Sequence, residues 1–400
     1  MLQGRPVQHL SGPPEVGEIC AAIREAIGEA PAALHEPEFA GAELRYLKDC
    51  IDTGWVSSAG AYVDRFERGL AELTGARHAI AVVNGTAALH LALLVAGVRA
   101  GDEVLVPALT FVATANAVTY CGAMPHFVDS EATSLGVDAA KLAAWLRAET
   151  ERVASGLRNK RTGRRIAALM PMHTFGHPAD LDALAAVCDE YRLPLVEDAA
   201  EAIGSEYKGR HVGHHGAISA LSFNGNKTIT TGGGGALITD DAALGRRAKH
   251  LSTTARLERG WEFVHDEVGY NYRLPNLNAA LGCAQLEQLA GFLADKRALA
   301  QRYRDAFAKV RCAKFCVEPS YGRSNYWLNA ILLEPQHAAL RDDVLGATNA
   351  AGHQARPVWT LMHRLPAFGA CPRMPLEQSE AIAERLINLP SSARLGRRRG

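Results

Sequence analysis

Short apolar runs rich in β-branched residues alternate with longer Ala- and Leu-rich runs from about Ala79 onward. The short runs predict buried strands, and the longer runs between them predict amphipathic helices. Because the strands are apolar throughout, the pattern predicts an α/β fold in which helices cover both faces of a largely parallel sheet. The expected strands are Ala79–Val83, Val104–Val106, Pro125–Val128, Ile166–Pro171, Pro194–Val196 and Ala217–Phe223. The expected helices are Ala87–Val95, Val112–Tyr120, Asp138–Glu149 and Asp180–Tyr191, with Asp138 and Asp180 as N-caps.

The pattern changes after Leu286, and this change predicts a second, smaller α/β domain. A helix is expected at Glu287–Val310 and a strand at Tyr326–Leu333. Before the sheet, helices are expected at Pro14–Ile27 and Pro37–Thr53, both packed on the large domain. A chain of 400 residues accommodates two or three domains. We therefore expect an N-terminal arm and helix over 1–36, a large domain over 37–290 and a small C-terminal domain over 291–400.

The charges of the chain are balanced, with 43 Lys and Arg residues against 43 Asp and Glu residues. This balance argues against a nucleic-acid partner or an anionic membrane surface. No apolar stretch approaches the roughly 20 residues that span a bilayer, and the start of the chain lacks the apolar core of a secretory signal, so a cytoplasmic protein is expected.

The sequence also predicts that the protein needs no metal. The eight cysteines form no zinc or disulfide framework. His211, His214 and His215 are expected in a hydrated loop. The basic segment Arg158–Arg165 looks like an insertion between a helix and a strand, and whether it touches a substrate stays open.

Polar motifs follow the predicted strands at their carboxyl ends, where open parallel sheets bind ligands. Asn84-Gly85-Thr86 follows the first strand, and a helix begins there. A glycine, a hydroxyl and the free N–H groups of a helix start suit a phosphate, although a tight turn with an N-cap has the same sequence. Glu197-Asp198-Ala199-Ala200-Glu201 follows a later strand, and a carboxylate there either faces a cationic ring nitrogen or begins a turn.

The third motif is Leu221-Ser222-Phe223-Asn224-Gly225-Asn226-Lys227, which precedes the four glycines Gly232–Gly235. A lysine just past a buried strand and before such a run is unusual. Desolvation there would favour the neutral amine that Schiff-base formation requires. Together the three motifs place a phosphate turn, an acidic residue and then a lysine in order along the chain. This order resembles that of fold-type I pyridoxal-phosphate enzymes, and the resemblance implies that the protein is one of them.

From about Pro37 to Ser392 the chain resembles the DegT/StrS family of nucleotide-sugar aminotransferases, which have the fold-type I, aspartate-aminotransferase-like fold. Within that family it is most similar to the legionaminic-acid-type branch. The stretches that carry the resemblance are Gly54–Ser58, Asn84–Leu89, Pro107–Thr114, Glu197–Ala202, Ser222–Gly235, Gly269–Leu274, Arg356–Pro366 and Asn388–Ser392.

The resemblance implies catalytic roles for three residues. Lys227 would carry pyridoxal 5′-phosphate as a Schiff base and move the proton once freed. Asp198 would pair with the pyridine nitrogen, and Glu201 would lie near the ring hydroxyl and share one proton with it. Many relatives have Gln or His at the position of Glu201.

The resemblance also implies how the cofactor is held. Gly85, Thr86 and Ser222 would bind the phosphate, and Phe111 would stack on the ring. Asn271 would reach the cofactor of the neighbouring subunit, which implies a homodimer with active sites at the interface.

The substrate side is implied less directly. Trp55, Ser57, Tyr62 and His363 lie in segments expected near the sugar. The implied reaction moves an amino group from an amino acid, taken as L-glutamate, through the pyridoxamine phosphate form to a nucleotide-linked 4-keto-6-deoxy sugar. The branch resemblance suggests a UDP- or GDP-linked 2-acetamido-2,6-dideoxy-4-ketohexose.

Three alternatives stay open. A sugar dehydratase of the same family would carry His at the position of Lys227. An amino-acid aminotransferase would need an arginine to bind the substrate carboxylate, for which Arg356 and Arg373 are candidates. A non-catalytic cofactor-binding protein, or a nucleotide-binding protein that uses Gly232–Gly235, is a third.

Overall fold

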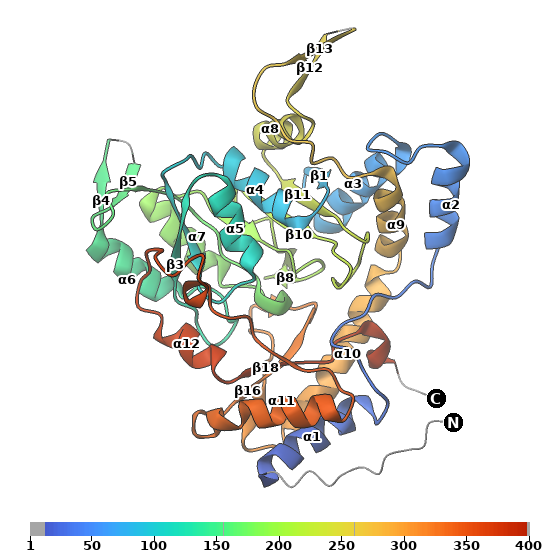
Figure 1. Ribbon diagram of the computed structural model, residues 1–400, viewed down its shortest axis with the longest axis vertical. Coiled ribbons are helices and arrows are strands. Elements are labelled where there is room, and N and C mark those ends of the chain that lie inside the picture. The colour runs from blue at the N-terminus through green and yellow to red at the C-terminus, as the bar shows by residue number, and fades with distance from the viewer. Residues whose placement is uncertain (1–12, 155, 260, 398–400) are drawn as a thin grey trace.

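The computed structural model describes residues 13–154, 156–259 and 261–397, so residues 1–12 of the expected N-terminal arm lie outside it. Its centre is a mixed sheet in which parallel strands predominate (Figure 1). In spatial order the strands are β1 (His78–Val82), β11 (Gly235–Thr239), β10 (Ile218–Ser222), β7 (Val196–Asp198), β6 (Arg165–Leu169), β2 (Glu103–Pro107) and β3 (Met124–Val128). Parallel bridges from Leu169 to Leu195 and from Met172 to Asp198 join its two halves between β6 and β7.

Parallel pairing holds for β10 with β7 and for β2 with both β3 and β6, as the continuous apolar runs predict. The exception is β11, which runs antiparallel between β1 and β10. The sequence does not predict this strand, because the glycines at its start are typical of a loop. Gly235 is required there: a Cβ atom on it would lie 2.5 Å from the Asn84 carbonyl oxygen, so β11 passes directly beside the turn after β1.

Seven helices of the described residues surround this sheet. They are α3 (Ala61–Thr74), α4 (Gly85–Val95), α5 (Val112–Tyr120), α6 (Ala139–Glu149), α7 (Leu181–Tyr191), α8 (Ala242–Ser252) and α9 (Asn276–Leu286). Helix α4 is buried along most of its length and packs on β10 and β11, which explains its apolar composition. The predicted N-caps are confirmed: the Asp138 side chain accepts a hydrogen bond from the Lys141 amide at 2.9 Å, and Asp180 accepts one from the Ala183 amide at 3.3 Å.

A second, antiparallel sheet has the strand order β14 (Ala313–Phe315), β16 (Asn329–Leu333), β18 (Leu386–Leu389) and β17 (Arg356–Pro357). Around it lie α1 (Pro14–Ile27), α10 (Leu289–Phe307), α11 (Arg341–Ala350) and α12 (Glu377–Ala383). Helix α1 packs on α10 and α11 and shares their apolar core, beside the second sheet (Figure 1). The expectation that α1 packs on the large domain is therefore wrong.

Other boundaries also differ from those expected. Helix α2 (Glu43–Thr53) begins at Glu43 and not at Pro37, because the Glu43 carboxylate accepts a hydrogen bond from the Gly41 amide at 2.8 Å and fixes a turn there. Strand β16 begins at Asn329 and not at Tyr326, whose φ of 47° is incompatible with a strand. Helix α10 (Leu289–Phe307) lies within the expected helix Glu287–Val310, and α9 (Asn276–Leu286), which precedes it, was not predicted.

The remaining strands are short. The segment Arg158–Arg165 comprises the end of β5 (Gly156–Asn159), the turn to β6 and the first residue of β6. Strand β5 also pairs with β4 (Thr150–Val153), which continues the main sheet. A second hairpin, β12 (Arg256–Arg259) and β13 (Glu262–His265), projects from the body of the protein (Figure 1). Strands β15 (Gly322–Arg323), β8 (Glu206–Tyr207) and β9 (Arg210–His211) form a small third sheet. Within the described part of the chain, no helix has the length and apolar character needed to cross a membrane.

Candidate active site

A cavity of about 340 Å³ lies at the carboxyl ends of β1, β7 and β10. Seven residues singled out from the sequence line it: Gly85, Thr86, Phe111, Asp198, Glu201, Ser222 and Lys227. It is also lined by Asn84, Leu89, Ala113, Met172, Ala200, Asn224, Asn226, Trp327 and Trp359. Residues more than 100 positions apart in the sequence therefore meet at the end of the sheet where the strand pattern predicts a ligand.

One end of the cavity combines a helix N-terminus, a glycine and a hydroxyl group. Helix α4 begins there, and its N-cap Asn84 accepts the Ala87 amide at 2.8 Å. The amides of Gly85 and Thr86 belong to the first turn and have no acceptor within the helix. A Cβ atom on Gly85 would lie 2.8 Å from the Ser222 Cβ and 2.9 Å from its hydroxyl oxygen, so only glycine lets the two strand ends approach this closely. Two amides and a hydroxyl are thus gathered at a positive helix end.

Asp198 lies at the end of β7 and is 2% exposed. Its Oδ2 accepts a hydrogen bond from the Thr114 hydroxyl at 2.7 Å, and its Oδ1 accepts one from the Ala200 amide at 3.2 Å. Burial raises the pKa of Asp198, although the hydrogen bond from Thr114 opposes the change. Among the described residues, no lysine, arginine or histidine lies within ion-pair distance of it. The carboxylate is therefore buried, held in orientation and without a cationic partner of its own.

Glu201 and Lys227 form an ion pair, with Nζ 3.2 Å from Oε1. Oε2 of Glu201 accepts the Phe175 amide at 2.9 Å. Burial is the largest influence on this carboxyl and raises the pKa of Glu201 to about 7, even though the Lys227 charge acts in the opposite direction. Lys227 Nζ also lies 3.7 Å from the centre of the Trp327 ring. Near pH 7 Glu201 can therefore take up or release a proton inside the cavity, beside the Lys227 amine.

Aromatic side chains form another wall. Phe111 is half-exposed, and its ring meets the Trp359 ring edge to face at a centroid distance of 6.1 Å. The Trp327 indole N–H donates to the Asn226 carbonyl at 2.8 Å, which fixes the ring above Lys227. These flat apolar surfaces suit an aromatic ring bound between them.

Five residues expected near the cofactor or the sugar do not line the cavity. Asn271 is exposed and makes an antiparallel bridge with Thr253. His363 binds Glu380 at 3.1 Å. Trp55, Ser57 and Tyr62 form a separate group, described next.

The backbone atoms of Trp55, Ser57 and Tyr62 are bound by one buried residue, Asn276. Its side chain donates to the Trp55 carbonyl at 2.7 Å and accepts the Tyr62 amide at 3.0 Å, and its amide donates to the Ser57 carbonyl at 2.7 Å. The segment is thereby fixed to α9, away from the cavity within this chain. The sequence gives no signal for Asn276.

The expectation that His211, His214 and His215 lie in a hydrated loop is wrong for His211, which is buried on β9, and the three side chains do not converge. His211 Nε2 accepts the Gly204 amide at 2.9 Å, while His214 binds Asp240 at 3.1 Å. His215 packs against the Tyr207 ring. Because the three imidazole rings have different partners, their nitrogen atoms do not point toward a common position where a metal ion could bind.

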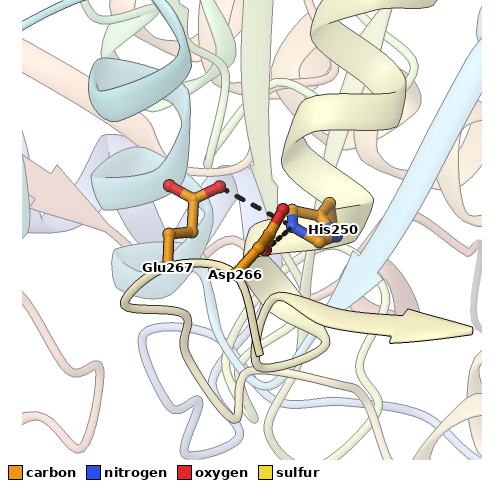
Figure 2. Close-up of side chains that lie close together, drawn as sticks. All are labelled: His250, Asp266 and Glu267. Carbon is orange, nitrogen blue, oxygen red and sulfur yellow. Dashed lines mark hydrogen bonds and ion pairs between the residues drawn. The ribbon is translucent and has the colours of Figure 1, made fainter. Parts of the chain in front are cut away.

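A different group, His250, Asp266 and Glu267, does bring nitrogen and carboxylate atoms close together (Figure 2). His250 lies 2.7 Å from Asp266, and Glu267 pairs with Arg247. These ion pairs join α8 to the segment after β13, which is a structural role.

The arginines considered for a substrate carboxylate are also elsewhere. Arg356 is exposed on β17, and Arg373 lines a different cavity. Among the described residues, no arginine lines the active-site cavity, so neither candidate is placed to bind a substrate carboxylate there. The residues of the site that sequence reasoning missed are Thr114, Trp327 and Trp359. Of these, Thr114 and Trp359 stood in stretches that the sequence marked, Pro107–Thr114 and Arg356–Pro366, whereas Trp327 stood in none.

Comparison with known proteins gives the family. The model of the DegT/DnrJ/EryC1/StrS aminotransferase family matches residues 37–399. A GDP-perosamine synthase from Vibrio cholerae is 37% identical over 359 residues, which cover 90% of this chain and 93% of that protein. A Bacillus subtilis protein assigned as a pyridoxal phosphate-dependent aminotransferase is 36% identical, covering 90% of this chain and 91% of that one. The crystal structure of the aminotransferase TlmJ from Streptoalloteichus hindustanus superposes with a TM-score of 0.81 at 29% identity, covering 90% and 94% of the two chains. The chain therefore belongs to the DegT/DnrJ/EryC1/StrS family and is a pyridoxal-phosphate-dependent sugar aminotransferase.

Proposed function

We propose that the protein transfers an amino group from L-glutamate to GDP-4-keto-6-deoxymannose and so makes GDP-perosamine. The observation that supports this substrate is the 37% identity, over nine-tenths of the chain, to a protein named GDP-perosamine synthase. The comparisons do not single out the legionaminic-acid-type branch. We therefore prefer the GDP-linked sugar to a 2-acetamido-2,6-dideoxy-4-ketohexose.

The residues of the cavity fit pyridoxal phosphate. The contact between Gly85 and Ser222 leaves a recess that a Cβ would fill, and Asp198 is a buried carboxylate without a cation. Gly85, Thr86 and Ser222 would bind the phosphate, Asp198 the ring nitrogen, and Lys227 the aldehyde carbon. When bound, the cofactor acts as an electron sink for the carbon that carries the amino group.

The chain's own residues then move protons. Lys227 is positioned to take a proton from the amino donor and to return one during transfer to the sugar. Glu201, 3.2 Å away, can hold or release the proton that Lys227 exchanges. Asp198 stays oriented by Thr114, so that its charge keeps the ring nitrogen protonated. Trp327 and Trp359 exclude water from one side of the cavity.

The substrate assignment is tested by comparing two sugars. Purified holoenzyme with L-glutamate would receive either GDP-4-keto-6-deoxymannose or UDP-2-acetamido-2,6-dideoxy-4-ketohexose, and the amino sugar and 2-oxoglutarate would be quantified. The proposal expects kcat/KM on the order of 100-fold higher for the GDP sugar. Lys227→Ala is the control and should give no product. Preference for the UDP sugar, or activity only between amino acids and keto acids, would contradict the proposal.

We further propose a homodimer in which Asn271 acts in the partner's active site. Its exposed position outside the cavity of its own chain supports this. Lys227→Ala and Asn271→Ala would each be nearly inactive alone. In mixed dimers of the two, one of the two sites would be intact, so mixing should restore activity. No recovery would mean that Asn271 acts within its own chain or not at all.

We also keep as a proposal the division into a three-layer large domain over 37–290 and a small domain over 291–400. The packing of α1 on α10 supports grouping the first helix with the small domain.

A further inference from the structure

A second cavity, of about 630 Å³, lies at the amino ends of β2 and β3, opposite the ends that face the active site. Glu103, the first residue of β2, and Met124, the first residue of β3, line it, whereas Phe111 follows the other end of β2 and lines the active-site cavity. The β5–β6 turn and the segment 370–375 complete it. It is therefore separate from the site described above and does not depend on the proposed function.

The floor of this cavity is a buried polar cluster around Glu103, which is fully buried. His126 Nδ1 donates to its carboxylate at 3.0 Å, Asn159 donates at 2.9 Å, and the Thr162 hydroxyl donates to the other oxygen. Burial opposes the charge of Glu103, but these hydrogen bonds together lower the pKa of its carboxyl. Both oxygens of the carboxylate are thus occupied by the protein, so Glu103 orients its neighbours and does not itself await a ligand.

His126 has one nitrogen left without a partner. Nδ1 donates to Glu103, which can only accept, so in the neutral form of the ring Nε2 is an acceptor. His126 is 1% exposed and lines the cavity, and Nε2 has no hydrogen-bond partner among the described residues. A buried acceptor left unpaired costs about 1–3 kcal/mol. A ligand that offers an O–H or N–H group would remove this cost.

Three arginines surround the cavity: Arg161 and Arg164 from the β5–β6 turn, and Arg373 from the C-terminal segment. Within the described part of the chain, no carboxylate lies within 4.0 Å of any of the three guanidinium groups. Two arginines nearby in the sequence do form ion pairs: Arg158 with Glu151 at 2.8 Å and Arg165 with Asp102 at 2.5 Å.

Within the described residues, most N–H donors of the three guanidinium groups make no hydrogen bond. Arg164 and Arg373 each give one hydrogen bond to a backbone carbonyl, that of Gly101 at 2.9 Å and that of Gly369 at 3.3 Å. Planar guanidinium groups bind phosphate oxygens through paired N–H donors. With three arginines against one glutamate, the cavity carries a net positive charge.

We propose that this cavity binds a phosphorylated metabolite that also carries hydroxyl or amino groups, as sugar phosphates and nucleotides do. The arginines hold the phosphate oxygens, and His126 Nε2 accepts a hydrogen bond from the hydroxyl or N–H group. The ligand joins the β5–β6 turn to the segment 370–375 across the cavity.

The test is calorimetric titration of the holoenzyme with four probes: inorganic phosphate, diphosphate, glucose 6-phosphate and GDP. The first two carry phosphate alone, and the last two distinguish a sugar phosphate from a nucleotide. The variant Arg164→Gln/Arg373→Gln removes two guanidinium groups. Arg158→Gln is the matched control, because it lies on the same hairpin and is not part of the cavity. Turnover should be unchanged in both variants, which shows that they are folded.

At least one of the two organic probes should bind the wild-type protein more tightly than inorganic phosphate and diphosphate. Its Kd should rise by about tenfold or more in the double variant and stay unchanged in Arg158→Gln. Equal affinity in the double variant would place the probe in the active site and overturn the proposal. So would the absence of binding by all four probes, or binding of inorganic phosphate as tight as that of the esters.

Discussion

Replacing Glu201 with glutamine should make the cofactor-free protein more stable at neutral and alkaline pH. Burial raises the pKa of Glu201 from 4.5 to about 7 in the folded protein, with the side chain 1% exposed. Between these values the folded protein binds the proton more tightly than the unfolded chain. The contribution of Glu201 to the free energy of unfolding is therefore fully present below pH 4.5 and is lost as the pH rises through about 7.

The magnitude follows from the two pKa values. One pKa unit corresponds to about 1.4 kcal/mol, so ionised Glu201 lowers the free energy of unfolding by about 3 kcal/mol. Most of this loss, about 2.5 kcal/mol, develops between pH 5 and pH 8. Glutamine keeps the shape and the acceptor for the Phe175 amide, but it has no charge to desolvate.

The assay is urea-induced unfolding of the cofactor-free wild type, Glu201→Gln, and the exposed control Glu72→Gln at pH 5 and pH 8. Comparing variants cancels the contribution of the titrating groups that do not contact Glu201; Lys227, its ion-pair partner, is the exception. Between pH 5 and pH 8, the free energy of unfolding of the wild type and of Glu72→Gln should fall by about 2.5 kcal/mol relative to that of Glu201→Gln. If the free energy of unfolding changed by the same amount in all three proteins, the argument that burial outweighs the Lys227 charge in setting the pKa of Glu201 would be refuted.

Three further changes have defined outcomes. Burial lowers the pKa of Lys296 from 10.5 to about 7, so between these pH values the unfolded chain binds the proton more tightly than the folded protein. In urea unfolding, the free energy of unfolding of the wild type should therefore rise between pH 7 and pH 10.5, and Lys296→Met should reduce this rise. Gly85→Ala places a Cβ 2.8 Å from that of Ser222 and should raise the Kd for pyridoxal phosphate by about tenfold or more in a cofactor titration. Gly17→Ala, where nothing lies within 4 Å, is its control and should bind normally. Asp198→Asn should lower kcat by a factor on the order of 100 in the coupled 2-oxoglutarate assay, with folding unchanged by circular dichroism.

Much of the main sheet could be predicted from the sequence because its strands are short and apolar throughout. Asp138 and Asp180 could be predicted as caps because their role is local. Strand β11 could not, since it begins in the glycine run Gly232–Gly235 and is fixed only by its approach to Asn84. The position of α1 could not either, because an amphipathic helix does not specify which core it covers.

The candidate site shows the same division. Lys227, Asp198 and the Gly85 turn follow strand ends, so the strand pattern alone gathers them. Trp327 reaches the cavity from the segment just before β16, and no local sequence pattern predicts that contact. Trp55 and Tyr62 were expected at the entrance, yet Asn276 binds their backbone elsewhere in this chain. Contacts made between distant segments, or between subunits, leave no signal in one sequence.

The central claim is that Lys227 holds pyridoxal phosphate in this cavity and that the cofactor takes the amino group from glutamate. The most direct measurement is the absorbance spectrum of the purified protein supplied with the cofactor, before and after addition of L-glutamate. The account predicts a visible band that glutamate converts to the shorter-wavelength pyridoxamine phosphate form, and no such band from a lysine linkage in Lys227→Ala. A wild-type protein with no visible band, or a Lys227→Ala protein with the same band and the same response, would contradict it.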